Sequence, residues 1–508
     1  MSPPAVLLLR PDDDVAVAMA DLPAGAVIDV AGRSFAARQR VPVGHKVAVR
    51  DVVVGGVVRK YGQPIGAASR PITAGDHVHT HNLAMTDVER TARSASTGVT
   101  PPVPAGLRPT FAGYRRGDGR VGTRSYVAIV STVNCSASTA RLIADQFRGR
   151  GLEEWPHIDG VVALTHSSGC GLVPTSDGGQ VLLRTLRGYA AHPNVSGLLV
   201  LGLGCEMVPV ETVLDGLALP PDTLVRTLTV QENGGIRRTV RAGVEAITSM
   251  LPELEGRRRV ECDVSELVLG LNCGGSDGYS GITANPALGL ASDRLVAYGG
   301  RSVLAETPEV FGAEHLLVER AVSPAVADAL LDRIAWWRRY AEQGGGTLDN
   351  NPSPGNKAGG LTTILEKSLG AVAKSGRAPL SAVYGYAEPI SRSGLGFMDT
   401  PGYDPVSVTG LVAGGATAVV FTTGRGSVLG SKPAPCLKVA TNTPMYERMA
   451  EDMDLNAGRI ADGTASLEEV GDEIFAALLD TASGRRTVSE ELDLGQDEFV
   501  PWQLGTVT

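Results

Sequence analysis

The sequence predicts an α/β protein with a small all-β domain at the N-terminus, linked to a large two-part α/β region with mostly parallel sheets. Short β-type runs separated by Gly, Pro and Asp turns fill residues 12–83, whereas β-type runs alternate with helical patterns from Gly113 onward. A chain of 508 residues has room for about three domains with cores of their own. We place these domains at 1–83, 109–257 and 258–508, with a linker at 84–108.

The N-terminal domain is predicted from four apolar runs, which cover residues 15–19, 27–30, 46–49 and 52–58. The chain then loses its apolar periodicity and accumulates Ser, Thr, Pro and Gly over residues 84–108, as an exposed linker does. Because such a segment does not fix a geometry, we expect it to let the small domain close over the α/β region.

Both α/β domains are predicted from alternating strands and helices. In the first, we expect strands at 126–133, 160–164 and 197–203, and helices at 138–147, 180–189 and 235–250. In the second, we expect strands at 266–271, 303–306, 380–384, 418–422 and 436–440, and helices at 324–343 and 467–482.

Composition argues against nucleic-acid and membrane proteins. The chain has 46 basic and 55 acidic side chains, a net charge of −9, and no basic stripe for nucleic acid or anionic lipid. Its apolar stretches are shorter than the ~18–20 residues of a membrane span, and we recognise no signal peptide. We therefore expect a cytoplasmic protein. The six scattered cysteines predict reduced thiols and no disulfide framework.

Four cysteines follow apolar runs at the ends of expected strands. The carboxyl ends of parallel strands line the ligand crevice of an α/β sheet, so these strand ends can converge on a shared site. Histidine and glutamate neighbours support a metal site, although a small buried side chain is the plainer interpretation of any single cysteine. The candidate metal ligands are Cys135, His166, Cys170, Cys205 and Cys273.

A second group of candidates is the alternating segment His77-Val-His79-Thr-His81. On a strand, alternate side chains share a face, so the three imidazoles would lie together. Neutral imidazoles suit Fe, Mn or Zn ions and can also act as a general base near neutral pH. His45, after a predicted turn, is a fourth candidate. A solvent-exposed cluster is the alternative, although three of the eight histidines fall within five residues.

Two polar, glycine-containing loops, at 351–360 and 421–426, carry the cations Lys357 and Arg425. Backbone N–H groups in such loops, together with Lys or Arg, bind carboxylates or phosphates. Glu306 and the acid three residues later follow an expected strand. These two acids can act in catalysis. The equally supported alternative is that they only stabilise the N-terminus of a helix.

Seven motifs stand in one collinear order. They are Gly44-His-Lys, His79-Thr-His-Asn82, His166-x-x-Gly-Cys170, Gly202-Leu-Gly-Cys-Glu206, Cys273-Gly-Gly-Ser-Asp277, Asn351-Pro-Ser-Pro-Gly-Asn-Lys357 and Thr422-Thr-Gly-Arg-Gly426. Through them the chain resembles the altronate/galactarate dehydratase family from residue 12 to about residue 484. The resemblance implies an N-terminal SAF-type β-domain, a large α/β catalytic part, and dehydration of a sugar acid with a divalent iron or manganese ion.

The implied reaction removes water from a 2,3-dihydroxy acid to give a 2-keto-3-deoxy acid. It needs a base at C2, a cation that holds the developing enediolate, and an acid for the departing hydroxyl. The catalytic candidates are His45, His79, His81 and Glu306. The substrate-binding candidates are Lys46, Ser276, Asp277, Asn356, Lys357 and Arg425. Fe(2+) or Mn(2+) is the implied cofactor, and an iron–sulfur cluster on the cysteines is the open alternative.

The substrate has several alternatives. The His79-Thr-His81 segment resembles the altronate branch, which makes an altronate-type dehydratase the first hypothesis. The segments at 384–388 and 397–405 depart from the altronate pattern, which keeps a galactarate dehydratase as the second. A sulfo-lyase acting on a sulfonated hydroxy acid and a non-enzymatic sugar-acid sensor are further alternatives. We expect a small-molecule sugar acid as the partner, no nucleic acid, no membrane, and a homo-oligomer, a dimer.

Overall fold

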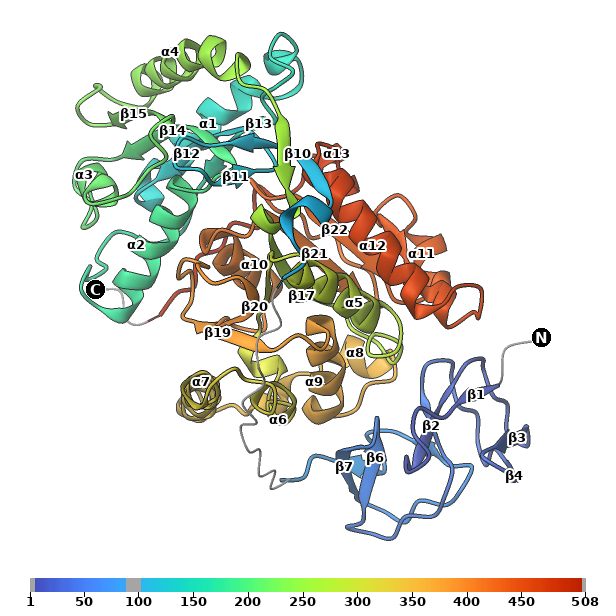
Figure 1. Cartoon of the computed structure of the whole chain (residues 1–508). Helices are drawn as coiled ribbons and strands as arrows, with labels where there is room; N and C mark the ends of the chain where they lie inside the picture. The colour runs from blue at the N-terminus through green and yellow to red at the C-terminus, as the bar shows by residue number, and fades with distance from the viewer. Residues whose placement is uncertain (1–4, 88–101, 505–508) are drawn as a thin grey trace.

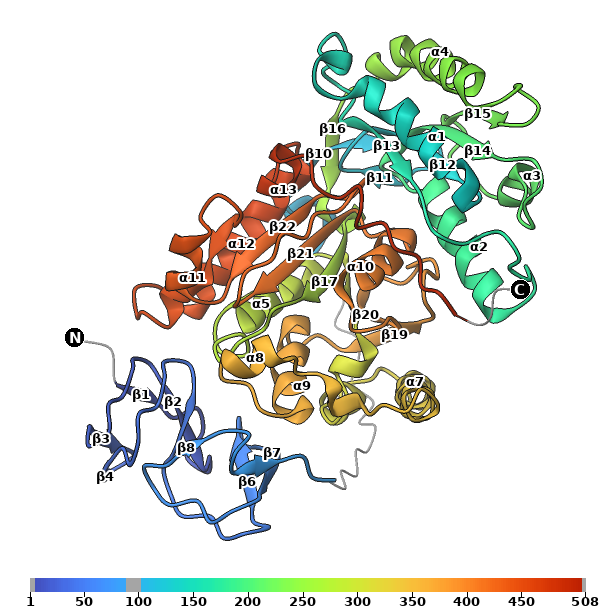
Figure 2. The ribbon, with the colours of Figure 1, turned by 180° about the vertical axis from the view of Figure 1, so that it is seen from behind.

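The computed structural model describes residues 5–87 and 102–504, and it has three parts (Figure 1). The predicted α/β class with an N-terminal β-domain is confirmed. The blue N-terminal domain and the teal and green middle domain lie at opposite ends, with the C-terminal domain between them in both views (Figures 1 and 2). Most of the predicted linker, residues 88–101, lies outside the described residues. No helix in the described part is long and apolar enough to cross a membrane.

The N-terminal domain consists of three small antiparallel sheets with strand orders β1-β2-β5-β8, β3-β4 and β6-β7-β9. The strands are β1 Val6–Leu7, β2 Val15–Ala18, β3 Val27–Val30, β4 Arg33–Ala36, β5 Lys46–Ala48, β6 Val57–Lys60, β7 Gln63–Ala68, β8 His77–Val78 and β9 Leu83–Ala84. The run at 52–58, expected as one strand, is broken by a turn in which Gly55 has φ +77°. Val52 therefore pairs with Ile72 only as an isolated bridge ahead of β6.

The middle domain is built on a parallel sheet with the order β13-β12-β14-β15. Its elements are β12 Tyr126–Ser131, α1 Asn134–Ala144, β13 Gly160–Leu164, α2 Asp177–Ala190, β14 Val195–Gly202, α3 Val210–Leu214, β15 Leu224–Thr229 and α4 Ile236–Glu255. Strands β12 and β14 are buried along their whole length, as expected for apolar strands covered on both faces. A small antiparallel sheet of β10 (Thr110–Arg115), β11 (Val121–Gly122) and β16 (Val260–Asp263) joins this domain to the next.

The C-terminal domain contains a seven-stranded parallel sheet with the order β19-β20-β18-β17-β21-β22-β23. Its strands are β17 Val268–Cys273, β18 Arg301–Leu304, β19 Leu380–Tyr384, β20 Gly394–Met398, β21 Ala418–Thr423, β22 Cys436–Ala440 and β23 Leu455–Asn456. Its helices are α5 Ala284–Ala297, α6 His315–Val318, α7 Pro324–Gln343, α8 Pro354–Ala358, α9 Ile364–Val372, α10 Asp404–Ala413, α11 Thr443–Arg448, α12 Leu467–Ala482 and α13 Val488–Glu491. The sequence pattern predicts the bounds of β19, β22, α7 and α12. It does not predict β20, because two glycines weaken that strand pattern.

The three domains share their cores. Helices α5 and α12 pack together and cover one face of the large sheet, while α10 packs against both β17 and helix α2 of the middle domain. Tyr126 and Val130 of the middle domain belong to the same buried cluster as Val412 and Phe421 of the C-terminal domain. The two α/β parts are therefore joined by a continuous apolar interior.

The N-terminal domain docks on α9 through a buried ion-pair group. The ammonium groups of Lys46 and Lys60 lie 2.8 Å and 2.9 Å from the two carboxylate oxygens of Glu366, and all three side chains are fully buried. Burial opposes ionisation of Glu366, but the two ammonium groups prevail and lower its pKa to about 2. Because a buried charge without its partner is costly, this group holds the β-domain in its docked position.

Candidate active site

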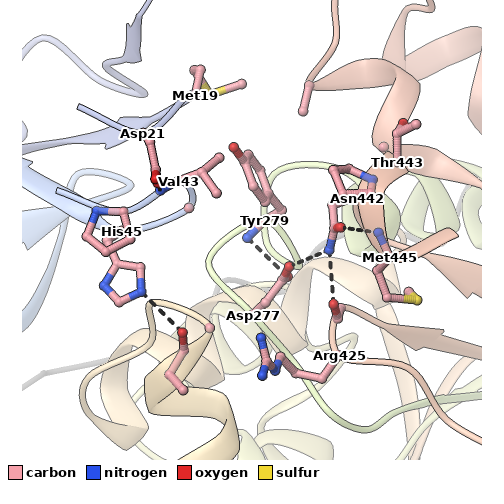
Figure 3. A pocket seen from close by; sticks show the side chains of 18 of the residues that line it. Met19, Asp21, Val43, His45, Asp277, Tyr279, Arg425, Asn442, Thr443 and Met445 are labelled. Carbon is pink, nitrogen blue, oxygen red and sulfur yellow. Dashed lines mark hydrogen bonds between the residues drawn. The ribbon is translucent and has the colours of Figure 1, made fainter. Parts of the chain in front are cut away.

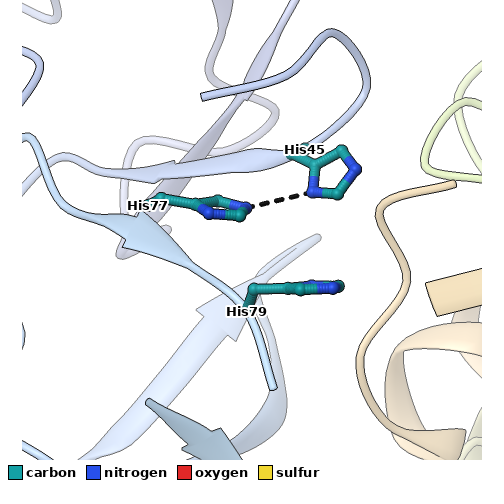
Figure 4. A group of neighbouring side chains, drawn as sticks. All are labelled: His45, His77 and His79. Carbon is teal, nitrogen blue, oxygen red and sulfur yellow. Dashed lines mark hydrogen bonds between the residues drawn. The ribbon is translucent and has the colours of Figure 1, made fainter. Parts of the chain in front are cut away.

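The imidazoles of the N-terminal domain gather where this domain faces the C-terminal domain. Nδ1 of His45 lies 3.0 Å from Nε2 of His77, and the rings of His77 and His79 stack at 5.3 Å (Figure 4). The ligand atoms of these three imidazoles all lie within 4.8 Å of one another. The ring of His81, which is exposed, lies 5.5 Å from that of His77. The predicted gathering of histidines is thus present, although β8 covers only the first two residues of the predicted strand.

The three clustered imidazoles are neutral at neutral pH. Burial, followed by the neighbouring imidazoles, lowers the pKa of His77 to about 3. Burial and the Lys46 ammonium lower the pKa of His79 to about 4, and burial also lowers the pKa of His45. Nδ1 of His79 is buried and has no hydrogen-bond partner among the described residues. Neutral imidazoles with a free lone pair are ligands for divalent iron, manganese or zinc, so this group fits a metal ion.

Hydrogen bonds define where the protons sit. Nε2 of His45 lies 3.2 Å from the carbonyl oxygen of Ala358, and a carbonyl can only accept, so this nitrogen carries the proton. Nδ1 of His45 must then accept the Nε2–H of His77. Nδ1 of His45 and Nε2 of His77 therefore share one proton. This proton must leave its place between them before an ion can bind both nitrogens.

A cavity of about 470 Å³ lies beside His45, between the N-terminal and C-terminal domains (Figure 3). Its polar wall includes Asp21, Arg40 and His45 from one side and Asp277, Arg425 and Asn442 from the other. Arg40 is paired with Asp21, whereas Arg425 is exposed and has no ion pair within the described part of the chain. Arg425 is therefore a cation that can bind an anionic ligand in the cavity.

Asp277 is fixed at the floor of this cavity by hydrogen bonds. Its carboxylate accepts from Thr441 Oγ1 at 2.9 Å, Asn442 Nδ2 at 2.9 Å and Ser280 Oγ at 3.0 Å. A Cβ at Gly424 would lie 2.2 Å from Cγ of Asp277, so the loop that carries Arg425 can approach this closely only with glycine at that position. Asp277 is thus a positioning residue for the Arg425 loop.

A second dense group lies buried at the carboxyl end of the large sheet. Cys273 ends β17, and Glu306 follows β18 with a left-handed backbone, φ +70°. Nζ of Lys374 lies 2.8 Å from both Cys273 Sγ and a carboxylate oxygen of Glu306, and Lys367 pairs with Glu309 at 2.6 Å. Cys273, Glu306 and Glu309 have the spacing of metal ligands. The Lys374 ammonium, however, already binds both the thiol and a carboxylate.

Comparisons with known proteins decide the family. Altronate dehydratase of Bacillus subtilis (strain 168) is 36% identical over 489 residues, which is 96% of both chains. Galactarate dehydratase (L-threo-forming) of Escherichia coli (strain K12) is 38% identical over 464 residues, 90% of this chain and 89% of that one. The chain belongs to the D-galactarate/altronate dehydratase family. The resemblance predicted from its motifs is confirmed.

The family profiles cover the chain in order. The altronate/galactarate dehydratase SAF domain matches residues 4–86, the D-galactarate dehydratase/altronate hydrolase second domain matches 113–255, and the D-galactarate/altronate dehydratase C-terminal domain matches 264–507. The chain is also similar to the (2R)-sulfolactate sulfo-lyase subunit beta of Chromohalobacter salexigens, with 34% identity over 402 residues, 78% of this chain and 97% of that subunit.

Four predicted substrate-binding residues of this dehydratase-family chain lie off the cavity wall. Lys46 is fully buried and donates to Glu366 and to the Gly360 carbonyl, so it holds the domain interface. Asn356 completes the capping box that Ser353 begins at the start of α8, and it donates to the carbonyl of Ser276. The Ser276 hydroxyl lies 3.8 Å from the Cys273 sulfur, and Lys357 is half-buried on α8. Asp277 and Arg425 are the two predicted substrate-binding residues that line the cavity.

The five predicted metal ligands do not form one group. Cys273 lies in the large sheet, whereas Cys135, Cys170 and Cys205 belong to the middle domain. His166 is engaged at both ring nitrogens, since Nε2 bonds the Ser131 carbonyl at 3.0 Å and Nδ1 accepts the Ser168 N–H at 3.2 Å. Both ring nitrogens of His166 are thus engaged in hydrogen bonds, and its role as a metal ligand stays a prediction.

The structure specifies the place of one predicted residue and adds another. His77, predicted with the alternating histidines, is the partner of His45. Asn442 binds Asp277 beside the cavity, and no motif pointed to it. Glu306, predicted as catalytic, lies fully buried beside Lys374 and away from the cavity lining.

Proposed function

We propose that this chain is a sugar-acid dehydratase that eliminates water from an altronate-type aldonate to give a 2-keto-3-deoxy acid. The observation that carries the proposal is the cavity between the domains. One wall presents His45 of the neutral imidazole cluster, and the other presents Arg425, which has no ion pair among the described residues. A hydroxy acid offers a carboxylate for the guanidinium and hydroxyl oxygens for the opposite wall.

The chain's own groups supply binding and proton transfer. Arg425 would hold the substrate carboxylate, and Asp277 keeps the Arg425 loop in place through its bonds to Asn442 and Thr441. His81, whose exposed ring lies 5.5 Å from that of His77, would accept the proton from C2. The docked β-domain forms one side of the cavity.

His45, His77 and His79 would hold the Fe(2+) or Mn(2+) ion that the family implies. Such an ion supplies a positive charge for the enediolate that develops as the proton leaves C2. Binding can be measured without turnover. We expect titration of the metal-free chain with Mn(2+), followed by electron paramagnetic resonance, to show one tight ion per chain that is lost in His79→Ala. Retention of the same stoichiometry in His79→Ala would overturn this assignment.

The match with altronate dehydratase supports an altronate-type substrate, and a second observation disfavours a sulfo-lyase. The match with the Bacillus altronate dehydratase extends over 96% of both chains, so it includes the histidine-bearing β-domain. The sulfo-lyase relatives are named as separate alpha and beta subunits, whereas both parts are fused here. The predicted homodimer stays a prediction, and light scattering on the purified chain would test it.

The substrate is tested by a panel of altronate, galactarate and sulfolactate, assayed with the metal-loaded chain for 2-keto-3-deoxy acid and for sulfite. We expect altronate to give the largest kcat/KM. Preferential turnover of galactarate would show that the chain is a galactarate dehydratase. Release of sulfite would show that it is a sulfo-lyase. Tight binding of a sugar acid with no product from any substrate would favour the sensor.

A further inference from the structure

Three exposed, free cysteines of the middle domain follow three neighbouring strands. Cys135 follows β12, Cys170 follows β13 and Cys205 follows β14, and the sheet order β13-β12-β14 makes these strands direct neighbours. All three strands are parallel, so their carboxyl ends meet at the same edge of the sheet. The site is separate from the histidine cluster, because the C-terminal domain lies between the middle and N-terminal domains in both views (Figures 1 and 2).

The loop with Cys170 is clamped to the loop with Cys135 by their neighbours. Asn134 donates its backbone N–H to the Ser168 carbonyl at 2.9 Å and its side-chain amide to the His166 carbonyl at 3.1 Å. Gly169 has φ +99°, and a Cβ there would lie 2.6 Å from the Thr132 carbonyl oxygen. Only glycine allows this approach, so the loop geometry holds Cys170 close to the start of α1.

The loop with Cys205 is clamped to the same strand end by one carboxylate. Glu206 accepts the backbone N–H groups of Leu203, Gly204 and Cys205 at 3.1, 2.6 and 2.9 Å, and it also accepts the Thr132 hydroxyl at 2.9 Å. One carboxylate therefore fixes the Cys205 loop against the end of β12.

The placement of the three cysteines after three separate strands suits a cluster better than a single ion. Within residues 5–87 and 102–504, two groups have ligand atoms all within 4.8 Å of one another, and the three cysteines do not form a third. One tetrahedral ion holds its thiolates at about 2.3 Å and needs such close spacing. An iron–sulfur cluster binds its thiolates on separate iron atoms and accepts a wider triangle. Cys135 also lies in the first turn of the 11-residue α1, where the helix dipole favours negative charge.

We propose that Cys135, Cys170 and Cys205 bind one [4Fe–4S] cluster through three thiolates. Each thiol gives up its proton to solvent when it binds iron. Such clusters ordinarily have four cysteine ligands, so three leave one iron open to an oxygen ligand such as a carboxylate or hydroxyl. This site goes beyond the proposed function, since it lies in a different domain from the cavity and uses none of its residues.

The test is anaerobic reconstitution of the full chain with ferrous iron, ferric iron and sulfide, followed by removal of unbound ions. We expect about four iron and four sulfide per chain, with the broad visible absorption of a cluster. Cys135→Ser, Cys170→Ser and Cys205→Ser should each lose most of this absorption. Cys262→Ser, a buried cysteine of β16, is the matched control and should retain it.

Two further measurements distinguish loss of the cluster from failure of the dehydratase proposal and from misfolding. His79→Ala should retain sulfide and visible absorption, because the histidine cluster lies elsewhere; this separates failure of the cluster from failure of the dehydratase proposal. Circular dichroism should show that the cysteine variants are folded. The inference is overturned if the wild type takes up iron without sulfide, takes up zinc alone, or if folded cysteine variants keep the full absorption.

Discussion

Two regions of the molecule crowd metal-ligating side chains together, and they differ in what lies between the ligands. In the histidine cluster, one shared proton lies between His45 and His77, and Nδ1 of His79 has no partner among the described residues. In the buried group, the Lys374 ammonium already binds Cys273 and Glu306 at 2.8 Å. The first region also opens on a cavity through His45. A group of Cys, His or Glu side chains thus indicates a metal site only where no Lys or Arg side chain already binds them.

The largest expected effect is on stability, in the buried group. Lys374→Met removes the cation that neutralises Glu306 and should lower the free energy of unfolding by about 3–5 kcal/mol, because an uncompensated buried carboxylate remains. Urea unfolding measures this. Lys357→Met, on the half-buried Lys357, is the control and should change little. A loss below about 1 kcal/mol for Lys374→Met would show that the group does not stabilise the fold.

The histidine cluster should show the opposite behaviour, with an effect on turnover and little on stability. His77→Ala and His79→Ala should each lower kcat by roughly two orders of magnitude, the scale of acid–base or metal-binding groups, with little change in Tm. His157→Ala, in the middle domain, is the control. A lower Tm with kcat preserved in the folded fraction would instead make these histidines structural. His81→Ala tests the predicted role of the exposed member in the same way.

Arg425 should contribute through substrate binding. Arg425→Ala removes a charge-assisted bond of about 1.5–3 kcal/mol and should lower kcat/KM about 10- to 100-fold, chiefly through KM. Arg338→Ala, an exposed arginine on α7, is the matched control. An unchanged KM in Arg425→Ala would place the substrate carboxylate elsewhere.

The smallest expected effect is on the pH dependence of stability. The pKa of His79 is lowered to about 4 in the folded chain, whereas it is about 6.5 in the unfolded chain. Between these values the unfolded state binds the extra proton, so stability falls as pH decreases from 6.5 toward 4. In the metal-free chain, His79→Gln should reduce this slope by less than about 1.4 kcal/mol per pH unit, because the ring is only partly buried. An unchanged slope would show that the ring is solvated.

The sequence predicted the fold well where local patterns determine it. Helix α7 begins with a serine cap and a proline, which fixes its start, and α12 carries a capping box at Ser466. The starts of both helices follow from these signals. Strand β20 does not, because its pairing with β18 and β19 stabilises a glycine-rich segment that has little strand propensity of its own.

The site was predicted in part. Alternation along residues 77–81 indicated the clustered imidazoles, and the glycine loop indicated Arg425. The burial of Lys46 could not be predicted, because its partner Glu366 is distant in sequence and comes close only when the domains dock. The separation of Cys273 from the other cysteines has a similar cause, since strand ends in two different sheets look alike in sequence.

The most direct test of the central claim is a crystal structure of the manganese-loaded chain with anomalous diffraction at the manganese edge. The claim is that the histidine cluster beside the cavity, and not the buried Cys273 group, binds the catalytic ion. We predict an anomalous peak bonded to His45, His77 and His79. A peak at Cys273, Glu306 and Glu309, with none at the histidines, would contradict the claim.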